Sequence, residues 1–148
     1  MKVAKTIRHK ILNHSSIFDE TIRVYNEALS FIIQVIDQEV EHVDAYSTKE
    51  MTNLIERLIH ATKSNPNPKY TEFNQRFYKF PSYFRRAAIA TAFGKVKSYR
   101  SLRKNWETEK QVTLENGRKF NKQPPTKQFK HKEFPVLYKG NMFKRTSD

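Results

Sequence analysis

The chain has 148 residues, no cysteine, a mean hydropathy of −0.81 and a formal net charge of +13. This length is sufficient for one domain with a core, and no stretch approaches the roughly 20 apolar residues that cross a bilayer. Disulfides and thiolate-bound zinc are excluded. The first ten residues lack the apolar stretch typical of a secretion signal, so we expect a cytoplasmic protein.

Positive charge and aromatic residues are concentrated in the second half of the chain. Residues 1–64 contain eight Lys/Arg and nine Asp/Glu, whereas residues 65–148 contain the other 20 Lys/Arg and only six Asp/Glu. The later part also holds 15 of the 19 aromatic residues. Cations suit phosphates and flat rings suit nucleobases, so this distribution favours a nucleic-acid partner. An anionic membrane would attract the same residues, so composition alone leaves both open.

The first elements predicted along the chain are a strand and a long helix. Residues 3–12 mix β-branched and charged residues, a pattern that predicts a strand. Ser16 and Asp19 resemble a capping box, and apolar residues then recur every three or four positions. This periodicity predicts an amphipathic helix over about 16–43.

Three further helices are expected in the middle of the chain. Ser47 and Glu50 form a second capping-box pattern, and the helix that follows must end before the two prolines of residues 64–68. A short helix is predicted over 69–78. Another is predicted over about 82–106, and it contains most of the candidate functional residues.

The last part of the chain predicts strands. Residues 112–120 place an Asn-Gly pair between two β-prone runs, which is a strong hairpin signal. Residues 123–126 contain two prolines and read as a rigid connector, and residues 134–143 read as a second hairpin. The order of strand, helices and strands predicts an α+β fold, mainly α, in which a helical block interrupts a β element.

The helix predicted over 82–106 separates into an apolar and a basic face. The apolar face contains Phe84, Ala88, Ala92, Tyr99, Leu102 and Trp106. The basic face contains Arg86, Lys97, Arg100 and Lys104, with Arg85 and Arg103 beside it. The only carboxylate on this helix is Glu107, at its end. We therefore expect an unneutralised row of cations, one helical turn apart, that is available to phosphates.

Each of these features also has a structural interpretation. The basic face could be an ordinary solvated surface. Phe93 lies within that face and could pack against a neighbouring helix instead of stacking on a base. Lys95 lies in the apolar stripe and could extend past it into solvent. Gly94 costs about 1 kcal/mol in a helix interior, which suggests close backbone approach to another helix or to a nucleic acid.

No catalytic or metal site is visible in the sequence. The five histidines are scattered, without the spacing of metal ligands. Asp37, Glu39 and Glu41 alternate on a helix, so they diverge around it. Three widely separated glycines cannot form a phosphate-binding loop. We expect no enzymatic activity and no cofactor in this chain.

Five segments resemble, in the same order, the N-terminal part of TnpB proteins. TnpB is the family of transposon-encoded RNA-guided endonucleases that is ancestral to type V CRISPR effectors. The segments are Lys5-Thr-Ile-Arg-His-Lys10, Val24-Tyr-Asn-Glu-Ala-Leu29, the run from Phe80-Pro-Ser-Tyr-Phe-Arg-Arg to Tyr99, Asn105-Trp-Glu107 and Phe134-Pro-Val-Leu-Tyr-Lys-Gly-Asn-Met-Phe143.

The resemblance implies a wedge-type split β-barrel, formed by residues 1–14 and 110–148, with a helical recognition lobe, residues 15–109, inserted between its halves. It also implies guide RNA and target DNA as partners. The family's RuvC-like nuclease domain and zinc ribbon follow the part that this chain resembles, so nuclease activity is not carried over. From the resemblance and the basic face together, the expected nucleic-acid-binding residues are Tyr83, Arg85, Arg86, Phe93, Lys95, Lys97, Arg100, Arg103 and Lys104.

Three functions are compatible with these observations. The first is a truncated N-terminal region of a TnpB-like transposon protein that binds RNA and DNA without cutting them. The second is a protein that docks a partner or an anionic membrane through the helix at 82–106. The third is a nuclease-less, RNA-guided regulator. If the first holds, replacing Arg86 and Arg100 together by alanine is expected to weaken binding to all sequences.

Overall fold

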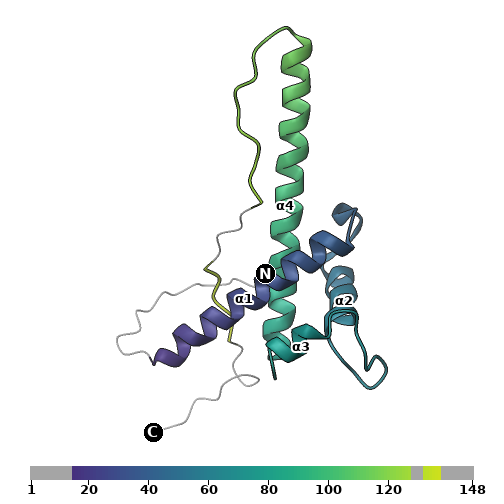
Figure 1. Ribbon diagram of the computed structural model, residues 1–148, viewed down its shortest axis with the longest axis vertical. Coiled ribbons are helices and arrows are strands. Elements are labelled where there is room, and N and C mark those ends of the chain that lie inside the picture. Colours follow the sequence, from purple (N-terminus) through teal and green to yellow (C-terminus); the bar gives the residue numbers. More distant parts are fainter. Residues whose placement is uncertain (1–14, 128–131, 138–148) are drawn as a thin grey trace, which may run out of the picture.

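The computed structural model describes residues 15–127 and 132–137, and these ranges form a helical fold without a strand (Figure 1). The strand predicted over 3–12 lies outside the described residues. The elements, in chain order, are α1 (Ser16–Glu39), a 3-10 helix η1 (Val43–Ala45), α2 (Thr48–Ile59), α3 (Glu72–Arg76) and α4 (Ser82–Glu115).

The expected α+β fold with a wedge-type split β-barrel is wrong for the described part of the chain. Residues 110–115 belong to α4, and residues 116–127 and 132–137 contain no strand. The first predicted hairpin is therefore absent. The second falls on residues 134–143, of which the structure describes 134–137, without a strand. The fold is a bundle of helices instead.

The Asn116-Gly117 pair ends a helix instead of joining two strands. Gly117 has a φ of 69°, its N–H donates to the Leu114 carbonyl at 2.9 Å, and the N–H of Arg118 donates to Thr113 at 3.1 Å. A left-handed glycine serves both as a helix C-cap and as a hairpin turn residue. The dipeptide therefore could not distinguish the two, and the helix-forming residues before it decided the outcome.

The helix starts follow the predicted capping chemistry closely. The cap of α1 is Ser15 and not the predicted Ser16: its Oγ accepts from the N–H of Ile17, so the helix begins one residue earlier than a Ser16 cap implies. The capping box of α2 is confirmed, because Ser47 and Glu50 bond each other's backbone N–H. Both side chains satisfy donors that the first helical turn leaves unpaired.

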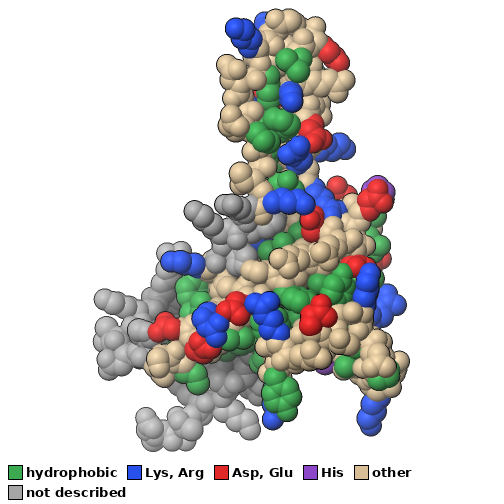
Figure 2. Space-filling model, viewed as in Figure 1, with side chains coloured by type: hydrophobic (Ala, Val, Ile, Leu, Met, Phe, Trp, Pro, Cys, Tyr) green, Lys and Arg blue, Asp and Glu red, His purple; other side chains and the backbone are tan. Residues whose placement is uncertain are grey.

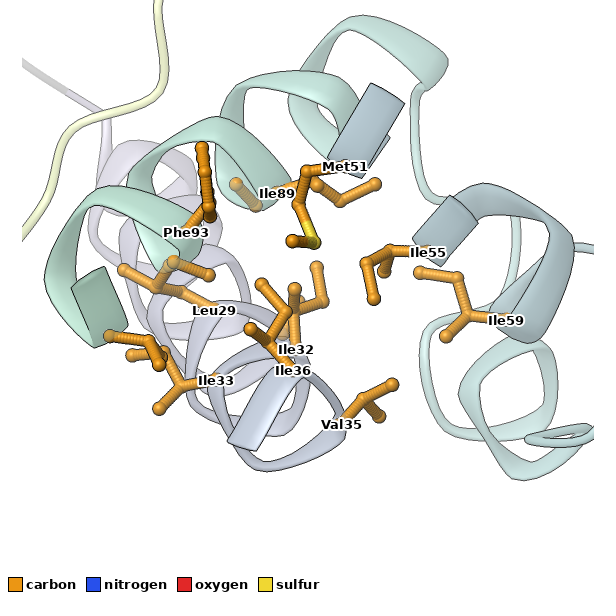
Figure 3. Close-up of a cluster of buried hydrophobic side chains, with 14 of the residues drawn as sticks. Leu29, Ile32, Ile33, Val35, Ile36, Met51, Ile55, Ile59, Ile89 and Phe93 are labelled. Atoms are coloured by element: carbon orange, nitrogen blue, oxygen red, sulfur yellow. The ribbon is translucent and has the colours of Figure 1, made fainter. Parts of the chain in front are cut away.

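The core lies where α1, α2 and α4 converge (Figure 3). Its side chains come from one face of each helix and are almost all aliphatic. The central ones are Leu29, Ile32, Val35 and Ile36 of α1, Met51, Ile55 and Ile59 of α2, and Ile89, Ala92 and Val96 of α4. Full burial of such side chains contributes about 1.5–3 kcal/mol each, which makes this seam the main source of stability.

A chain of aromatic rings continues the core beneath α1. Phe73 and Phe77 lie 5.0 Å apart between ring centroids, Phe77 and Phe80 6.0 Å, and Phe80 and Phe84 6.1 Å. Tyr25 of α1 contacts Phe84 edge to face at 5.8 Å. Apart from Tyr25, these rings belong to the aromatic-rich second half of the chain, and their role is packing.

Only the first half of α4 is covered by other helices. In Figure 1 its second half extends beyond the bundle, and the chain then turns back alongside it. The last residue of α4 that bonds α1 or the segment after it is Arg100. The 15 helical residues from 101 to 115 span about 22 Å. The fold thus exposes one long helical projection.

Two glycine substitutions in α4 are expected to have opposite effects on stability. Gly94→Ala should raise the free energy of unfolding by up to about 1 kcal/mol, because alanine favours a helix interior and the added Cβ meets nothing within 4 Å. Gly117→Ala should cost about 1 kcal/mol, because its backbone is left-handed although there is space. Denaturant unfolding checks the first, and hydrogen exchange of amides 112–115 checks the second. Equal effects of both variants would contradict the assignment of Gly94 to a helix interior and of Gly117 to a left-handed helix end.

Candidate nucleic-acid interface

The predicted basic face of α4 is largely paired with carboxylates. Five of its six cations form ion pairs: Arg85 and Arg86 with Glu56, Lys97 with Asp44, Arg100 with Asp37, and Arg103 with Glu107. Lys95, in the apolar stripe, pairs with Glu133. Most of these carboxylates come from the acidic first half of the chain. The expectation of an unneutralised row is therefore wrong. It failed because a helical wheel includes only the residues of one helix and cannot show carboxylates that other elements supply.

Arg85 is part of the packed interior. It is 7% exposed, and its Nε lies 3.2 Å from Glu56 Oε1. Arg86 contacts the same oxygen at 3.4 Å, but its side chain is 64% exposed. One carboxylate of α2 therefore serves two consecutive guanidinium groups of α4. A buried charge needs such a partner, so Arg85 is committed to this contact.

Arg100 closes the C-terminal end of α1. Its Nη1 donates to the carbonyls of Val40 at 2.5 Å and Glu41 at 2.6 Å. Its Nη2 donates at 3.2 Å to both the carbonyl and the carboxylate of Asp37. A cation at this position satisfies unpaired carbonyls and complements the negative end of the helix dipole. Arg100 therefore has a structural role.

The buried side of α4 is rotated relative to the predicted apolar face. Phe93 is 6% exposed and belongs to the core with Ile89 and Val96, so the packing interpretation of this residue is confirmed. Leu102, by contrast, is 56% exposed, and Trp106 lies beyond the bundle. The aliphatic residues at positions 89 and 96, which the predicted face omitted, decide which side packs. Phe93 is not available for stacking on a base.

The remaining predicted residues differ in their surroundings. Tyr83 is exposed at the start of α4, on the bundle. Lys95 is bound to Glu133 at 2.8 Å, which explains a lysine within the apolar stripe. Lys104 is exposed, and within the described ranges it has no carboxylate partner. The structure thus does not gather the nine predicted residues into one surface.

The extended segment after α4 is held against the helices by polar contacts. Lys127 bonds Asp37 at 2.7 Å, and Asn26 exchanges two 2.9 Å hydrogen bonds with the backbone of Glu133. Partial burial opposes ionisation of Asp37, but hydrogen bonds from Lys127 and Arg100 outweigh it and lower its pKa. The carboxylate therefore remains charged at neutral pH and joins α1, α4 and this segment.

The projecting part of the molecule is a second basic surface, which we call the finger and define as residues 101–122. It combines the end of α4 with the start of the returning chain. The indole of Trp106 donates to the Lys122 carbonyl at 2.9 Å and contacts Phe120 edge to face at 5.7 Å. Lys122 also pairs with Glu109 at 2.7 Å. The two sides of the finger are thus fastened together.

The finger carries six cations and three carboxylates. In the part of the chain that the structure describes, four of these cations form no ion pair: Lys104, Lys110, Arg118 and Lys119. Figure 2 shows several Lys and Arg side chains along the projection, with a few Asp and Glu side chains among them. The Lys110 ammonium lies 5.1 Å from the centroid of the Trp106 ring. Unpaired charges at an accessible end suit a polyanion.

The sequence pattern did not indicate three of these four cations. Lys110, Arg118 and Lys119 fell in the region assigned to the β-barrel, so they were not placed on a surface with Lys104. A prediction that continued the helix through residue 115 would have placed Lys110 within two turns of Lys104 on the same helix. The turn at Gly117 then places Arg118 and Lys119 at the tip.

Fold and surface together define a small helical-bundle protein with a projecting basic finger. None of the described helices is long and apolar enough to span a membrane. The chain belongs to the Aq_aa04 family, whose model matches residues 5–148. No curated protein and no solved structure matches the chain. The family match names no activity, and the resemblance to TnpB stays a prediction.

Arg85→Ala should lower the free energy of unfolding by about 3 kcal/mol, because it leaves the Glu56 carboxylate without its buried partner. Arg86→Ala is the matched control. It removes the same charge from the same carboxylate but from an exposed side chain, so its cost should stay below about 1 kcal/mol. Chemical denaturation of both variants measures the difference. Comparable losses would mean that Arg85 is not a buried structural residue.

Proposed function

We propose that this protein binds the phosphate backbone of nucleic acids through its finger. The observation that carries the proposal is the set of unpaired cations, Lys104, Lys110, Arg118 and Lys119, on a projecting element. Bundle cations such as Arg85 and Arg100 are already engaged with carboxylates and carbonyls. These four finger cations break no ion pair of the described residues when they meet a phosphate.

The chemistry of the finger supports backbone contact without base readout. Phosphate contacts by Lys and Arg are independent of sequence and release counterions. Trp106, the ring at the centre of the finger, is held by Phe120 and by the Lys122 carbonyl, so it stiffens the projection instead of offering a free face. A stiff, cationic projection can enter a groove or lie along a strand with little loss of conformational entropy.

The partners named by the TnpB resemblance, guide RNA and target DNA, are compatible with this proposal. They are not required by it, because the finger contacts depend only on phosphates. Docking of a membrane or protein through the apolar face of α4 is less well supported. That function needs the face exposed, whereas its residues Phe84, Ala88 and Ala92 are buried in the core with α1 and α2.

A double variant at the tip tests the proposal. Arg118→Ala with Lys119→Ala should weaken binding to structured RNA and to duplex DNA alike, because both lose two phosphate contacts. The slope of log affinity against log salt for duplex DNA should become shallower by about 2. Fluorescence anisotropy across a salt series measures both quantities.

Arg86→Ala with Lys97→Ala is the matched control. It removes the same charge from cations that already have carboxylate partners on the bundle. Its affinity and slope should stay close to those of the parent chain. If the control loses as much as the tip variant, net charge and not the finger governs binding. If the parent chain binds neither nucleic acid, the proposed function is overturned.

A further inference from the structure

A polar pocket lies at the C-terminal end of α2, on the bundle and away from the finger. It has a volume of about 490 Å³ and is lined by residues of α2 and of the loop that follows. Arg57 and His60 form one wall, and Thr62, Ser64 and Asn65 form the other. None of these five residues belongs to the basic face of α4 or to the finger.

The loop wall of the pocket is held in place by short hydrogen bonds. Thr62 and Asn65 exchange backbone bonds of 2.9 and 3.2 Å, and the Asn65 N–H also lies 3.1 Å from Thr62 Oγ1. The Asn65 side chain donates to the Arg57 carbonyl at 2.7 Å, which ties the loop to α2. The hydroxyls of Thr62 and Ser64 lie 3.1 Å apart. The polar groups of the pocket are therefore preorganised.

The lining residues supply mainly donors and positive charge. Arg57 is exposed and has no ion-pair partner in the ranges that the structure describes. The single lining carboxylate, Glu56, is already bonded by Arg85 and Arg86. Because Arg85 and Arg86, which do not line the pocket, neutralise Glu56, Arg57 is left as the uncompensated charge among the lining residues. Such a site attracts anions, and a planar guanidinium suits a phosphate group in particular.

His60 provides an independent indication of a ligand. It lines the pocket, and its Nδ1 is, among the described residues, the one buried side-chain polar atom without a hydrogen-bond partner. Leaving such an atom unpaired costs about 1–3 kcal/mol, so it requires an explanation. A ligand oxygen would recover that cost only by accepting a hydrogen bond from Nδ1 itself, after a movement of the ring that makes this buried atom accessible.

We propose that this pocket binds a phosphate group, through Arg57, His60 and the hydroxyls of Thr62 and Ser64. The group can belong to a free phosphate, to a nucleotide or to the end of a nucleic-acid strand, because all three present the same oxygens. The site goes beyond the finger function and does not depend on it.

Titration of the full chain with inorganic phosphate, followed by proton–nitrogen NMR, tests the proposal. The amides of His60, Thr62 and Ser64 should shift and saturate, whereas chloride at equal ionic strength should leave them in place. Parallel titrations with a nucleoside monophosphate and with an oligonucleotide, with or without a terminal phosphate, identify the source that binds tightest. Shifts that do not saturate, or that chloride reproduces, would overturn the proposal.

Arg57→Ala should weaken phosphate binding about tenfold or more, and Arg57→Lys should recover only part of it. The Asn65 bond to residue 57 uses the backbone carbonyl, so the pocket wall is retained in both variants. Lys49→Ala, on the same helix but outside the pocket, is the charge-matched control and should bind like the parent chain. Equal losses in Arg57→Ala and Lys49→Ala would rule the site out. The Arg118→Ala/Lys119→Ala variant should retain phosphate binding, which separates this test from that of the finger.

Discussion

The contact between α4 and the carboxylates of the preceding helices determines how this molecule is built. Glu56 of α2 receives Arg85, and Asp37 of α1 receives Arg100, about four helical turns further along α4. Between these two points α4 packs its aliphatic side onto both helices. A helix pinned at two distant positions has one orientation available. The position of everything beyond Arg100, including the finger, follows from it.

This arrangement divides the cations of the chain into two groups with different physical roles. Those on the first half of α4 balance carboxylates across a helix interface and contribute to the fold. Those beyond it have no such partners in the described part of the chain and leave a local excess of charge on a narrow projection. Two segments of one helix thus differ in role: the first packs within the bundle, and the second belongs to the surface for which we propose nucleic-acid binding. In the described part of the chain, carboxylates of other elements form ion pairs with the first segment and not with the second.

Local sequence patterns predicted the helices but not their partners. The capping box at Ser47 and the apolar periodicity of α1 depend on residues close in sequence, so both could be derived from the chain alone. The pairing of Arg85 with Glu56 joins residues 29 positions apart, which no periodicity reports. The hairpin predicted at Asn116-Gly117 was wrong for another reason, since a left-handed glycine is compatible with both a hairpin turn and the end of a helix. The finger was not predicted because the residues around this glycine were assigned to strands instead of to a continuing helix.

The double hydrogen bond between Asn26 and Glu133 has a consequence for the order of folding. It joins residues 107 positions apart, so it encloses most of the chain in one loop. Closing so long a loop is entropically unfavourable until the enclosed helices have already become compact. We therefore expect the segment around Glu133 to dock last and to detach first when the protein is destabilised. Its release exposes the flank of α1 while the aliphatic seam of the bundle stays intact.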